Sequence, residues 1–274
     1  MIVDEPQLSG HFIDSEKGQI FVTQFGEIAN DTAIICLPSI FEELNLSRAV
    51  LAKQAQYFAR HNAPCFLLDY YGTGDSVGEC SDASAELWLQ DVIALGNWLQ
   101  ERGIKRIILW GVRFGALLTL AFQRQLHEQL PIVAQLFWKP VLSGKQFCGQ
   151  FIRIKQANSL MQGSGEKIDW RQHILSGNET EVAGYLINKS FYQSLESLAL
   201  DKQFNPLSKI YWLELASSNE SPLMRRTIEQ WPEGLYSIKC LPAPAFWQVP
   251  EVFDLPEIYP VTWQEISPLF EGHS

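Results

Sequence analysis

The feature that most constrains the fold is a short stretch in which an apolar strand runs into a helix through a glycine-flanked turn. Residues 106–110 read RIILW, an apolar run typical of a strand buried on both faces of a parallel sheet. The turn reads GVRFG at 111–115, and its glycines permit a sharp, crowded change of direction. We therefore predict that Arg113 projects from the carboxyl edge of a parallel sheet.

The remaining segments alternate between strands and helices, which predicts a mostly parallel central sheet flanked by helices. Residues 141–205 break this alternation and are predicted to form an inserted helical cap. The core then consists of residues 1–140 and 206–274, and core and cap form a single structural unit of 274 residues. The predicted elements are a hairpin at 10–25, strands at 33–38, 64–69, 131–138, 209–216 and 234–241, and helices at 47–61 (with Ser47 as a cap), 84–102, 115–126 and 262–270.

The pattern of the turn is that of the nucleophile elbow of α/β-hydrolases, G-x-S-x-G, with arginine in place of serine. A guanidinium carries its charge at every physiological pH and donates hydrogen bonds without accepting a proton. Arg113 therefore cannot attack an acyl carbon. The helix that starts at Phe114 would direct its amide hydrogens and its positive dipole end toward the same place.

Ligands of open α/β sheets bind beyond the carboxyl ends of the strands, so the residues at those ends are candidate site residues. Most of the residues at these strand ends are polar or aromatic. They are Ser39, Ile40, Glu42 and Glu43 after the strand at 33–38, Asp69 and Tyr71 around the end of the strand at 64–69, and Lys139 after the strand at 131–138.

The positions at which a hydrolase carries its acid and its base are also altered. The acid position holds Asn219 with Glu220 beside it, and the base position lies in LPAPAFWQVPE at 241–251, where Phe246 or a neighbouring residue replaces histidine. Serine hydrolysis needs a base that takes the hydroxyl proton and returns it to the leaving group. The sequence therefore predicts that the usual Ser-His-Asp triad is absent.

Composition excludes several other classes of protein. A net charge of −10 and a pI near 5.0 argue against a nucleic-acid or anionic-membrane partner, since both require a basic face. The five cysteines have no metal-ligand spacing and are predicted to be reduced. We predict no metal site and no cofactor, no membrane span and no signal peptide, and therefore a cytoplasmic protein.

Nearly the whole chain from residue 33 onward resembles one family, the exosortase A system-associated hydrolases of the second type. The resemblance implies an α/β-hydrolase fold in a bacterium with an exosortase and exopolysaccharide locus, and a family in which arginine at the elbow is usual. The segments that carry it are FEELNLSR at 41–48, DYYGTGDSVGE at 69–79, WLQD at 88–91, GVRFGALL at 111–118, WKPVLSGKQF at 138–147, EVAGY at 181–185 and PAFW at 244–247.

Three functions remain open. In the first, the protein binds an anionic acyl or sugar ligand, or acts on it with Arg113, Glu42, Glu43 or Asp69 as catalytic groups. In the second, those carboxylates hold Arg113 in a buried ion pair and the protein is a scaffold or assembly partner in the exopolysaccharide pathway. In the third, it hydrolyses an ester or acyl substrate with Ser39, Ser76 or Ser143 as a relocated nucleophile. The predicted ligand-binding residues are Arg113, Phe114, Ser39, Ile40, Glu42, Glu43, Tyr71, Lys139 and Trp247.

Overall fold

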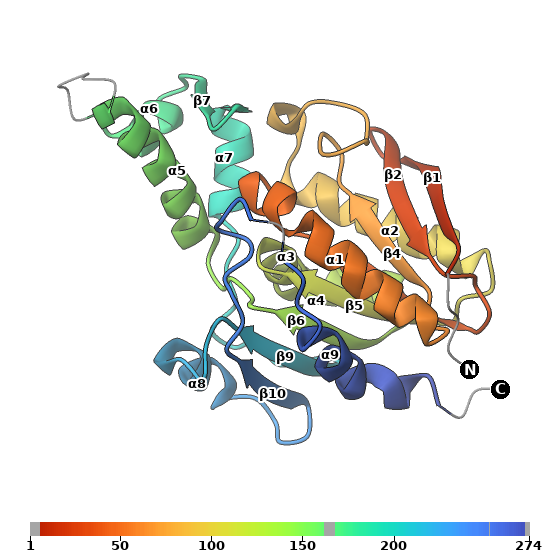
Figure 1. Ribbon diagram of the computed structural model, residues 1–274. Helices are drawn as coiled ribbons and strands as arrows, with labels where there is room; N and C mark the ends of the chain where they lie inside the picture. Colours follow the sequence, from red (N-terminus) through yellow and green to blue (C-terminus); the bar gives the residue numbers. More distant parts are fainter. Residues whose placement is uncertain (1–5, 162–167, 252, 272–274) are drawn as a thin grey trace.

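An eight-stranded, mostly parallel sheet forms the centre of the molecule (Figure 1). The computed structural model describes residues 6–161, 168–251 and 253–271. The strand order is β1-β2-β4-β3-β5-β6-β9-β10, with β2 antiparallel to both β1 and β4 and the other neighbours parallel, which confirms the predicted sheet. The strands are β1 Leu8–Ser15, β2 Gly18–Phe25, β3 Thr32–Leu37, β4 Cys65–Asp69, β5 Arg106–Val112, β6 Ile132–Trp138, β9 Lys209–Leu215 and β10 Tyr236–Leu241.

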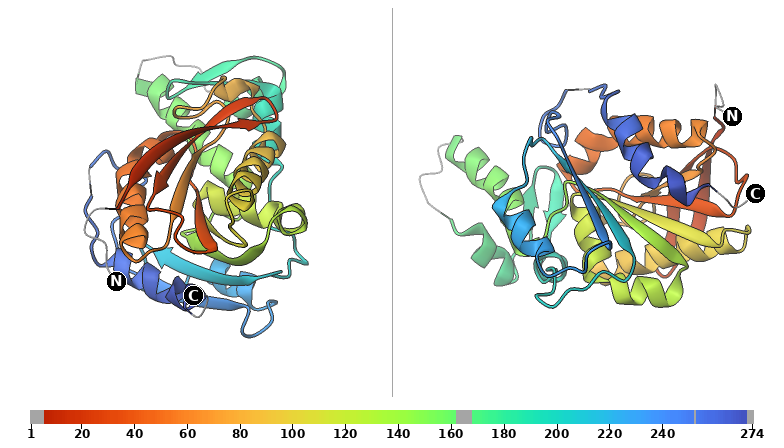
Figure 2. Two further views of the ribbon diagram at one scale, coloured as in Figure 1. Left: turned by 90° about the vertical axis from the view of Figure 1, so that its right-hand side faces the viewer. Right: turned by 90° about the horizontal axis from the view of Figure 1, so that it is seen from below.

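Helices cover both faces of this sheet (Figure 2). Along β3, Ile34 and Cys36 belong to the hydrophobic cluster under α1 and α9, whereas Ile35 and Leu37 belong to the cluster under α2 and α3. The strand is buried on both faces, as its continuous apolar sequence predicts. The helices of the core are α1 Glu42–Arg60, α2 Ala85–Gln100, α3 Phe114–Ala121, α4 Gln123–Gln129, α8 Pro222–Ile228 and α9 Ile258–Ile266, with 3-10 turns η1 Cys80–Asp82 and η2 Ser267–Leu269.

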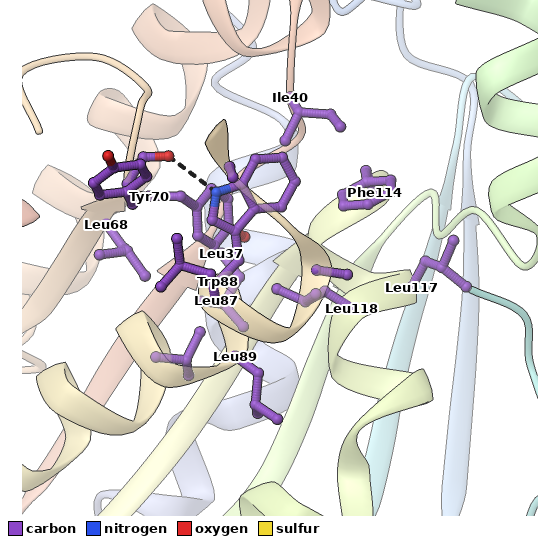
Figure 3. Close-up of a cluster of buried hydrophobic side chains, with 14 of the residues drawn as sticks. Leu37, Ile40, Leu68, Tyr70, Leu87, Trp88, Leu89, Phe114, Leu117 and Leu118 are labelled. Carbon is purple, nitrogen blue, oxygen red and sulfur yellow. Dashed lines mark hydrogen bonds between the residues drawn. The ribbon is translucent and has the colours of Figure 1, made fainter. Parts of the chain in front are cut away.

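The cluster between α2 and α3 is built around a fully buried tryptophan (Figure 3). The ring of Trp88 lies 5.2 Å from that of Tyr70 and 6.0 Å, edge to face, from that of Phe114. Its Nε1 donates to the backbone oxygen of Tyr71 at 3.0 Å, so the buried polar atom is satisfied. This packing joins the glycine-rich loop after β4 to the first residue of α3.

The segment between β6 and β9 lies at the carboxyl end of the sheet (Figure 1). It contains α5 Gly144–Met161, α6 Trp170–Leu175, a hairpin of β7 Thr180–Val182 and β8 Tyr185–Ile187, and α7 Lys189–Glu196. The hairpin differs from the predicted helical cap, and its strands of three residues each are too short to produce an alternating pattern in the sequence. Residues 162–167 of the predicted cap lie outside the described residues.

An aromatic cluster attaches this segment to the core at Phe41. The ring of Phe41 stacks on Phe151 at a centroid distance of 4.0 Å, lies 6.4 Å from Phe147 and meets Phe191 edge to face at 6.0 Å. All four side chains belong to the same buried cluster as the core residues under α2 and α3. The segment is therefore packed as a continuation of the core.

Several predicted helix boundaries are wrong. Helix α1 begins at Glu42, and Ser47 is a buried residue within it whose Oγ donates to the backbone oxygen of Glu43 at 2.6 Å, so it is no cap. The backbone before the helix turns through Phe41, with φ of +58°, which apolar spacing does not predict. The predicted helix at 115–126 is divided at Phe122 into α3 and α4. The last helix begins at 258 because Pro260 is tolerated in its first turn.

Candidate functional site

The turn between β5 and α3 holds Arg113 in a backbone conformation that side chains rarely adopt, with φ of +53° and ψ of −110°. A Cβ at Gly115 would lie 1.9 Å from the backbone oxygen of Leu37, and one at Gly111 would lie 2.6 Å from Cα of Ala116. Only glycine fits at both positions, because backbone atoms already occupy the space. The turn presses α3 against the end of β3 and fixes the direction in which Arg113 leaves the backbone.

The guanidinium of Arg113 makes a two-pronged ion pair with Glu43. Its Nε donates to Oε2 at 3.2 Å and its Nη2 to Oε1 at 2.9 Å, and Ser39 Oγ donates to the same Oε2 at 2.6 Å. The ring of Trp247 lies 5.1 Å from Cζ of Arg113, within the range of a cation–π contact. Arg113 is 8% exposed, so water screens this pair only weakly.

The same guanidinium keeps donors that Glu43 does not use. An arginine side chain has five N–H groups, and the pairing with Glu43 takes two of them, which leaves three. Among the described contacts, Nη1 has only a long one of 3.5 Å to the backbone oxygen of Lys139. Arg113 can therefore hold a second acceptor without losing Glu43.

Two cavities meet at this ion pair. The first, of about 220 Å³, is here called the apolar cavity; it is lined by Ile40, Phe41, Leu46, Phe147, Phe151, Ile154 and Trp247, together with Glu42, Glu43, Gln150 and Gln248. The second, of about 230 Å³, is called the polar cavity; it is lined by Arg113, Lys139, Gln146, Gln150, Glu214 and Ser221, together with Pro140, Val141, Leu142, Phe147, Trp212, Leu223 and Met224. Phe147 and Gln150 line both.

A second buried ion pair lies in the wall of the polar cavity. Lys139, which follows β6 with φ of +45°, donates through Nζ to Oε1 of Glu214, and Trp212 Nε1 donates to Oε2 at 2.9 Å. Glu214 is only 4% exposed. Glu214 is not among the site residues predicted from the sequence. A single carboxylate within the apolar strand KIYWLEL is nevertheless a signal, because a buried charge requires a partner.

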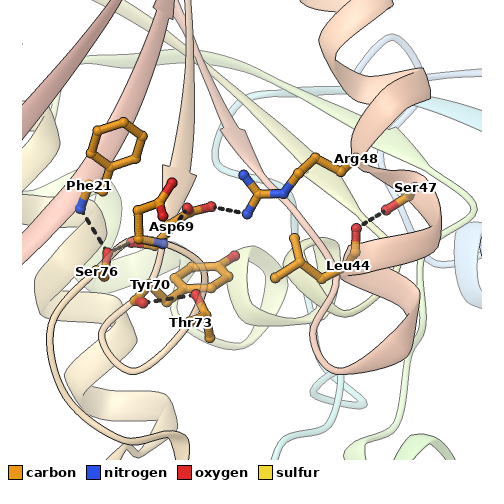
Figure 4. A network of polar contacts seen from close by, with 9 residues as sticks. Phe21, Leu44, Ser47, Arg48, Asp69, Tyr70, Thr73 and Ser76 are labelled. Carbon is orange, nitrogen blue, oxygen red and sulfur yellow. Dashed lines mark hydrogen bonds and ion pairs between the residues drawn. The ribbon is translucent and has the colours of Figure 1, made fainter.

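Asp69, predicted as a possible partner of Arg113, instead holds the glycine-rich loop (Figure 4). It pairs with Arg48 of α1 at 2.6 Å, and its backbone oxygen accepts from Ser76 Oγ. The hydroxyl of Ser76 in turn accepts from the backbone N–H of Phe21 at 2.7 Å. No contact among the described residues joins Asp69 to Arg113.

Tyr71 lies in the same loop. A Cβ at Gly78 would lie 2.1 Å from Cζ of its ring, its backbone N–H donates to Asp91 Oδ2 at 2.8 Å, and Lys17 Nζ lies 5.1 Å from the ring centroid. Tyr71 lines neither the apolar nor the polar cavity. Of the predicted ligand-binding residues, the described structure thus gathers Arg113, Ser39, Ile40, Glu42, Glu43, Phe114, Lys139 and Trp247 in the region of the two cavities and places Tyr71 apart.

The backbone N–H groups of Ile40 and Phe114 are candidate donors to a ligand. Neither donates a hydrogen bond to another of the described residues. Phe114 is the first residue of α3, where the helix dipole favours negative charge. In serine hydrolases of this architecture, amides from these two loops stabilise an oxyanion.

The candidate relocated nucleophiles have partners within their own turns. Ser39 donates to Glu43, and Ser143 Oγ accepts from the backbone N–H of Gln146 at 3.3 Å. Within the described residues, hydrogen bonds between a serine and a histidine side chain join Ser9 to His11 and Ser208 to His127, and none of these four side chains lines the apolar or the polar cavity.

The loops expected to carry the acid and the base hold other residues. Glu220 pairs with Arg225 at 3.1 Å on the surface. In the loop after β10, Phe246 is fully buried and packs on Trp138 at a centroid distance of 6.2 Å. The residue of this loop that faces the elbow is Trp247.

The described residues offer no clustered metal ligands and no membrane-spanning helix, and two of their thiols are unreactive. Among the described residues there is no group of three or more His, Cys, Asp or Glu side chains able to hold a metal ion. Within that same part of the chain, no helix is long and apolar enough to cross a membrane. Burial raises the pKa of the Cys36 and Cys65 thiols well above the usual range, which keeps them protonated and unreactive.

Comparison with known proteins gives structural similarity only. No family model and no curated protein matches the sequence. Est1E from Butyrivibrio proteoclasticus, solved with ferulic acid, superposes with a TM-score of 0.64 at 12% identity, over 96% of this chain and 100% of that one. The mouse alpha/beta hydrolase domain-containing protein 10 gives 0.58 at 15% identity, over 96% and 99%.

A further neighbour is XC6422 from Xanthomonas campestris, described as an α/β serine hydrolase without a lid, with a TM-score of 0.56 at 11% identity, over 100% of this chain and 99% of that one. Identities this low relate the architectures and leave the chemistry open. The strand order, the glycine-flanked turn after β5 and these neighbours together establish that the chain has the α/β-hydrolase fold.

Proposed function

We propose that this protein binds a negatively charged acyl or sugar compound at Arg113 and does not carry out serine hydrolysis. The observation that carries the proposal is the set of three N–H groups on Arg113 that Glu43 leaves unused. The backbone amides of Ile40 and Phe114, which have no acceptor among the described residues, lie in the two loops that flank it. Several donors without an acceptor favour an oxyanion as the ligand.

The absence of a Ser-His-Asp triad is part of the proposal. Arg113 occupies the turn where the nucleophile would stand, and Trp247 faces it from the loop where the base would stand. Neither residue can take or return a proton during acyl transfer. Any reaction at this site would use Arg113 as an electrostatic group and Glu43 as the acid or base, because Glu43 is the carboxylate in contact with it.

The resemblance to exosortase-associated hydrolases supports a place in exopolysaccharide assembly, and we propose a cytoplasmic location there. Carboxylated or phosphorylated sugars and acyl compounds are the anions that such an assembly offers. The carboxylate or phosphate oxygens of these compounds could accept the hydrogen bonds that Arg113 can donate.

A scaffold role is the second candidate function, and one observation favours it. Both cations of the site already have buried counter-ions, Glu43 for Arg113 and Glu214 for Lys139. Such pairs are stable without any ligand, so the site could be a residual structural feature in a protein that acts through its surface.

Thermal unfolding with a panel of sugar phosphates, uronic acids, acyl phosphates and fatty acids separates the two functions. The informative variant replaces both partners, Arg113→Met with Glu43→Leu, because it removes the charges without leaving one buried alone. Under the binding proposal a compound stabilises the wild type, and the matched surface variant Arg102→Ala, but not the double variant. If no compound stabilises the wild type, the scaffold function is favoured, and co-purification with a partner protein would support it.

A further inference from the structure

We propose that the ligand is an amphiphile, a singly charged carboxylate on an unbranched hydrocarbon chain, with its charged head in the polar cavity and its chain in the apolar cavity. This inference rests on the proposed binding function and specifies its ligand. It follows from the contrast between two cavities that share one wall, at Phe147 and Gln150.

The apolar cavity has the lining that a hydrocarbon chain requires. Phe41 and Phe151 stack face to face at 4.0 Å and form one side of it, and Leu46 of α1 lies in its wall. Ile154, also in the wall, is 39% exposed, and Val249, next to the lining residue Gln248, is 38% exposed. Exposed apolar side chains at the edge of an apolar cavity are surface that a bound chain would cover.

The polar cavity supplies the donors for a head group. Arg113 contributes its unused N–H groups, and Lys139 lies in the same wall. The residues of helix α5 that line the two cavities are uncharged, so the helix adds no negative charge to oppose an anionic head. The cations that favour such a head over a neutral one are Arg113 and Lys139.

The two carboxylates of the site limit the charge of that head. Glu43 and Glu214 partly neutralise Arg113 and Lys139, so a doubly charged phosphate would meet more repulsion than a single carboxylate does. A planar carboxylate also fits the fork of N–H groups on a guanidinium. The site therefore favours fatty carboxylates over alkyl phosphates of the same length.

Calorimetric titration tests this with hexanoate, octanoate and decanoate, with the alcohols of equal length, and with octyl phosphate, all below their micellar concentrations. We expect affinity to rise by up to about fourfold for each added methylene until the apolar cavity is full. The alcohols and octyl phosphate should bind at least about tenfold more weakly than the matching carboxylates, since they lack the charge or carry too much of it.

Three tryptophan substitutions locate the chain and the head. Ile154→Trp fills the apolar cavity and should remove the gain from octanoate to decanoate while hexanoate still binds. Leu223→Trp narrows the polar cavity and should weaken all three carboxylates equally. Leu207→Trp is the control, because Leu207 is 54% exposed and lines neither cavity. Melting temperatures establish that each variant is folded.

Each outcome decides between the claims. If the affinity for the carboxylates depends on Arg113 but not on chain length, the proposal of an amphiphilic ligand is refuted, whereas the proposal of an anion site at Arg113 is supported. Equal binding of alcohols and carboxylates refutes the charged head, and octyl phosphate binding as tightly as octanoate refutes the single charge. If none of these amphiphiles binds the wild type but a sugar phosphate or a uronic acid stabilises it, the amphiphile proposal is refuted and the anion-binding function stands. If no compound of either panel binds, the proposed function fails as well.

Discussion

The burial of the Arg113–Glu43 ion pair predicts how much its removal changes the free energy of unfolding. The side chains of Arg113 and Glu43 are 10% and 18% exposed, so removal of either one leaves the other charge largely desolvated. Breaking such a pair from one side costs about 3 kcal/mol of the free energy of unfolding, whereas replacing both partners with apolar residues of similar volume is close to neutral. The relevant variants are Arg113→Met, Glu43→Leu and the two combined.

The expected changes can be worked out for each variant. Arg113→Met should lower the melting temperature by about 6–12 °C, at about 2–4 °C per kcal/mol for a domain of this size, and Glu43→Leu by somewhat more. Glu43→Leu should be the less stable single variant by roughly 1 kcal/mol, because it also removes the acceptor of the fully buried Ser39 hydroxyl. The double variant should lie within about 1 kcal/mol of the wild type.

Urea unfolding of the four proteins measures the coupling as a double-mutant cycle. From the values above, the coupling should be about 6 kcal/mol in size, since single losses of about 3 and about 4 kcal/mol replace a combined loss of about 1. If the single variants each cost less than about 0.5 kcal/mol and their effects add, the pair behaves like a surface ion pair. The argument from its burial would then be refuted.

Three further predictions concern the turn, a buried acid and the charge of the site. Gly115→Ala should lower the free energy of unfolding by about 3 kcal/mol or more, because the added Cβ would lie 1.9 Å from a backbone oxygen. The control Gly149→Ala, whose Cβ would have no atom within 4 Å, should stabilise α5 by up to about 1 kcal/mol, and equal effects of the two variants in urea unfolding would contradict the close approach. Burial raises the pKa of Asp91 from 3.8 to about 6, so the protonated carboxyl stabilises the fold fully below pH 3.8, and this stabilisation, about 3 kcal/mol, is lost as the pH rises through 6. Asp91→Asn should flatten the pH dependence of the free energy of unfolding over this window, and an unchanged slope would refute the assignment. Glu43→Gln should tighten binding of octanoate by at least several-fold in calorimetric titration, since it removes a negative charge beside the head group, and an unchanged affinity would show that no anion binds next to Glu43.

The sequence was sufficient to predict the fold because the strong signals were long and repeated. Continuous apolar runs marked the parallel strands, and the glycines at 111 and 115 marked the turn that carries Arg113. At both positions a side chain would collide with backbone atoms, so the two glycines by themselves indicate a tight turn. Helix boundaries were less predictable, since the start of α1 depends on the positive φ of Phe41.

The partner of Arg113 could not be chosen from the sequence. Glu42, Glu43 and Asp69 all follow strands that end at the same edge of the sheet. The choice depends on the rotation of α1, which places Glu43 against the guanidinium and, five residues further on, Arg48 against Asp69. The rotation of a helix about its axis is set by its packing on the sheet, and no short sequence pattern predicts it.

The stacked rings of Phe41 and Phe151 also determine how a ligand can enter. If the segment between β6 and β9 swung away as a rigid body, it would have to separate these rings and expose Phe147 and Phe191, which belong to the continuous core. That movement would resemble partial unfolding and would be rare on the timescale of ligand exchange. Entry by rotation of exposed side chains at the mouth, chiefly Ile154, disturbs far fewer contacts. Association should therefore be limited by fast rotamer changes, and the protein should remain closed around its core while ligands come and go.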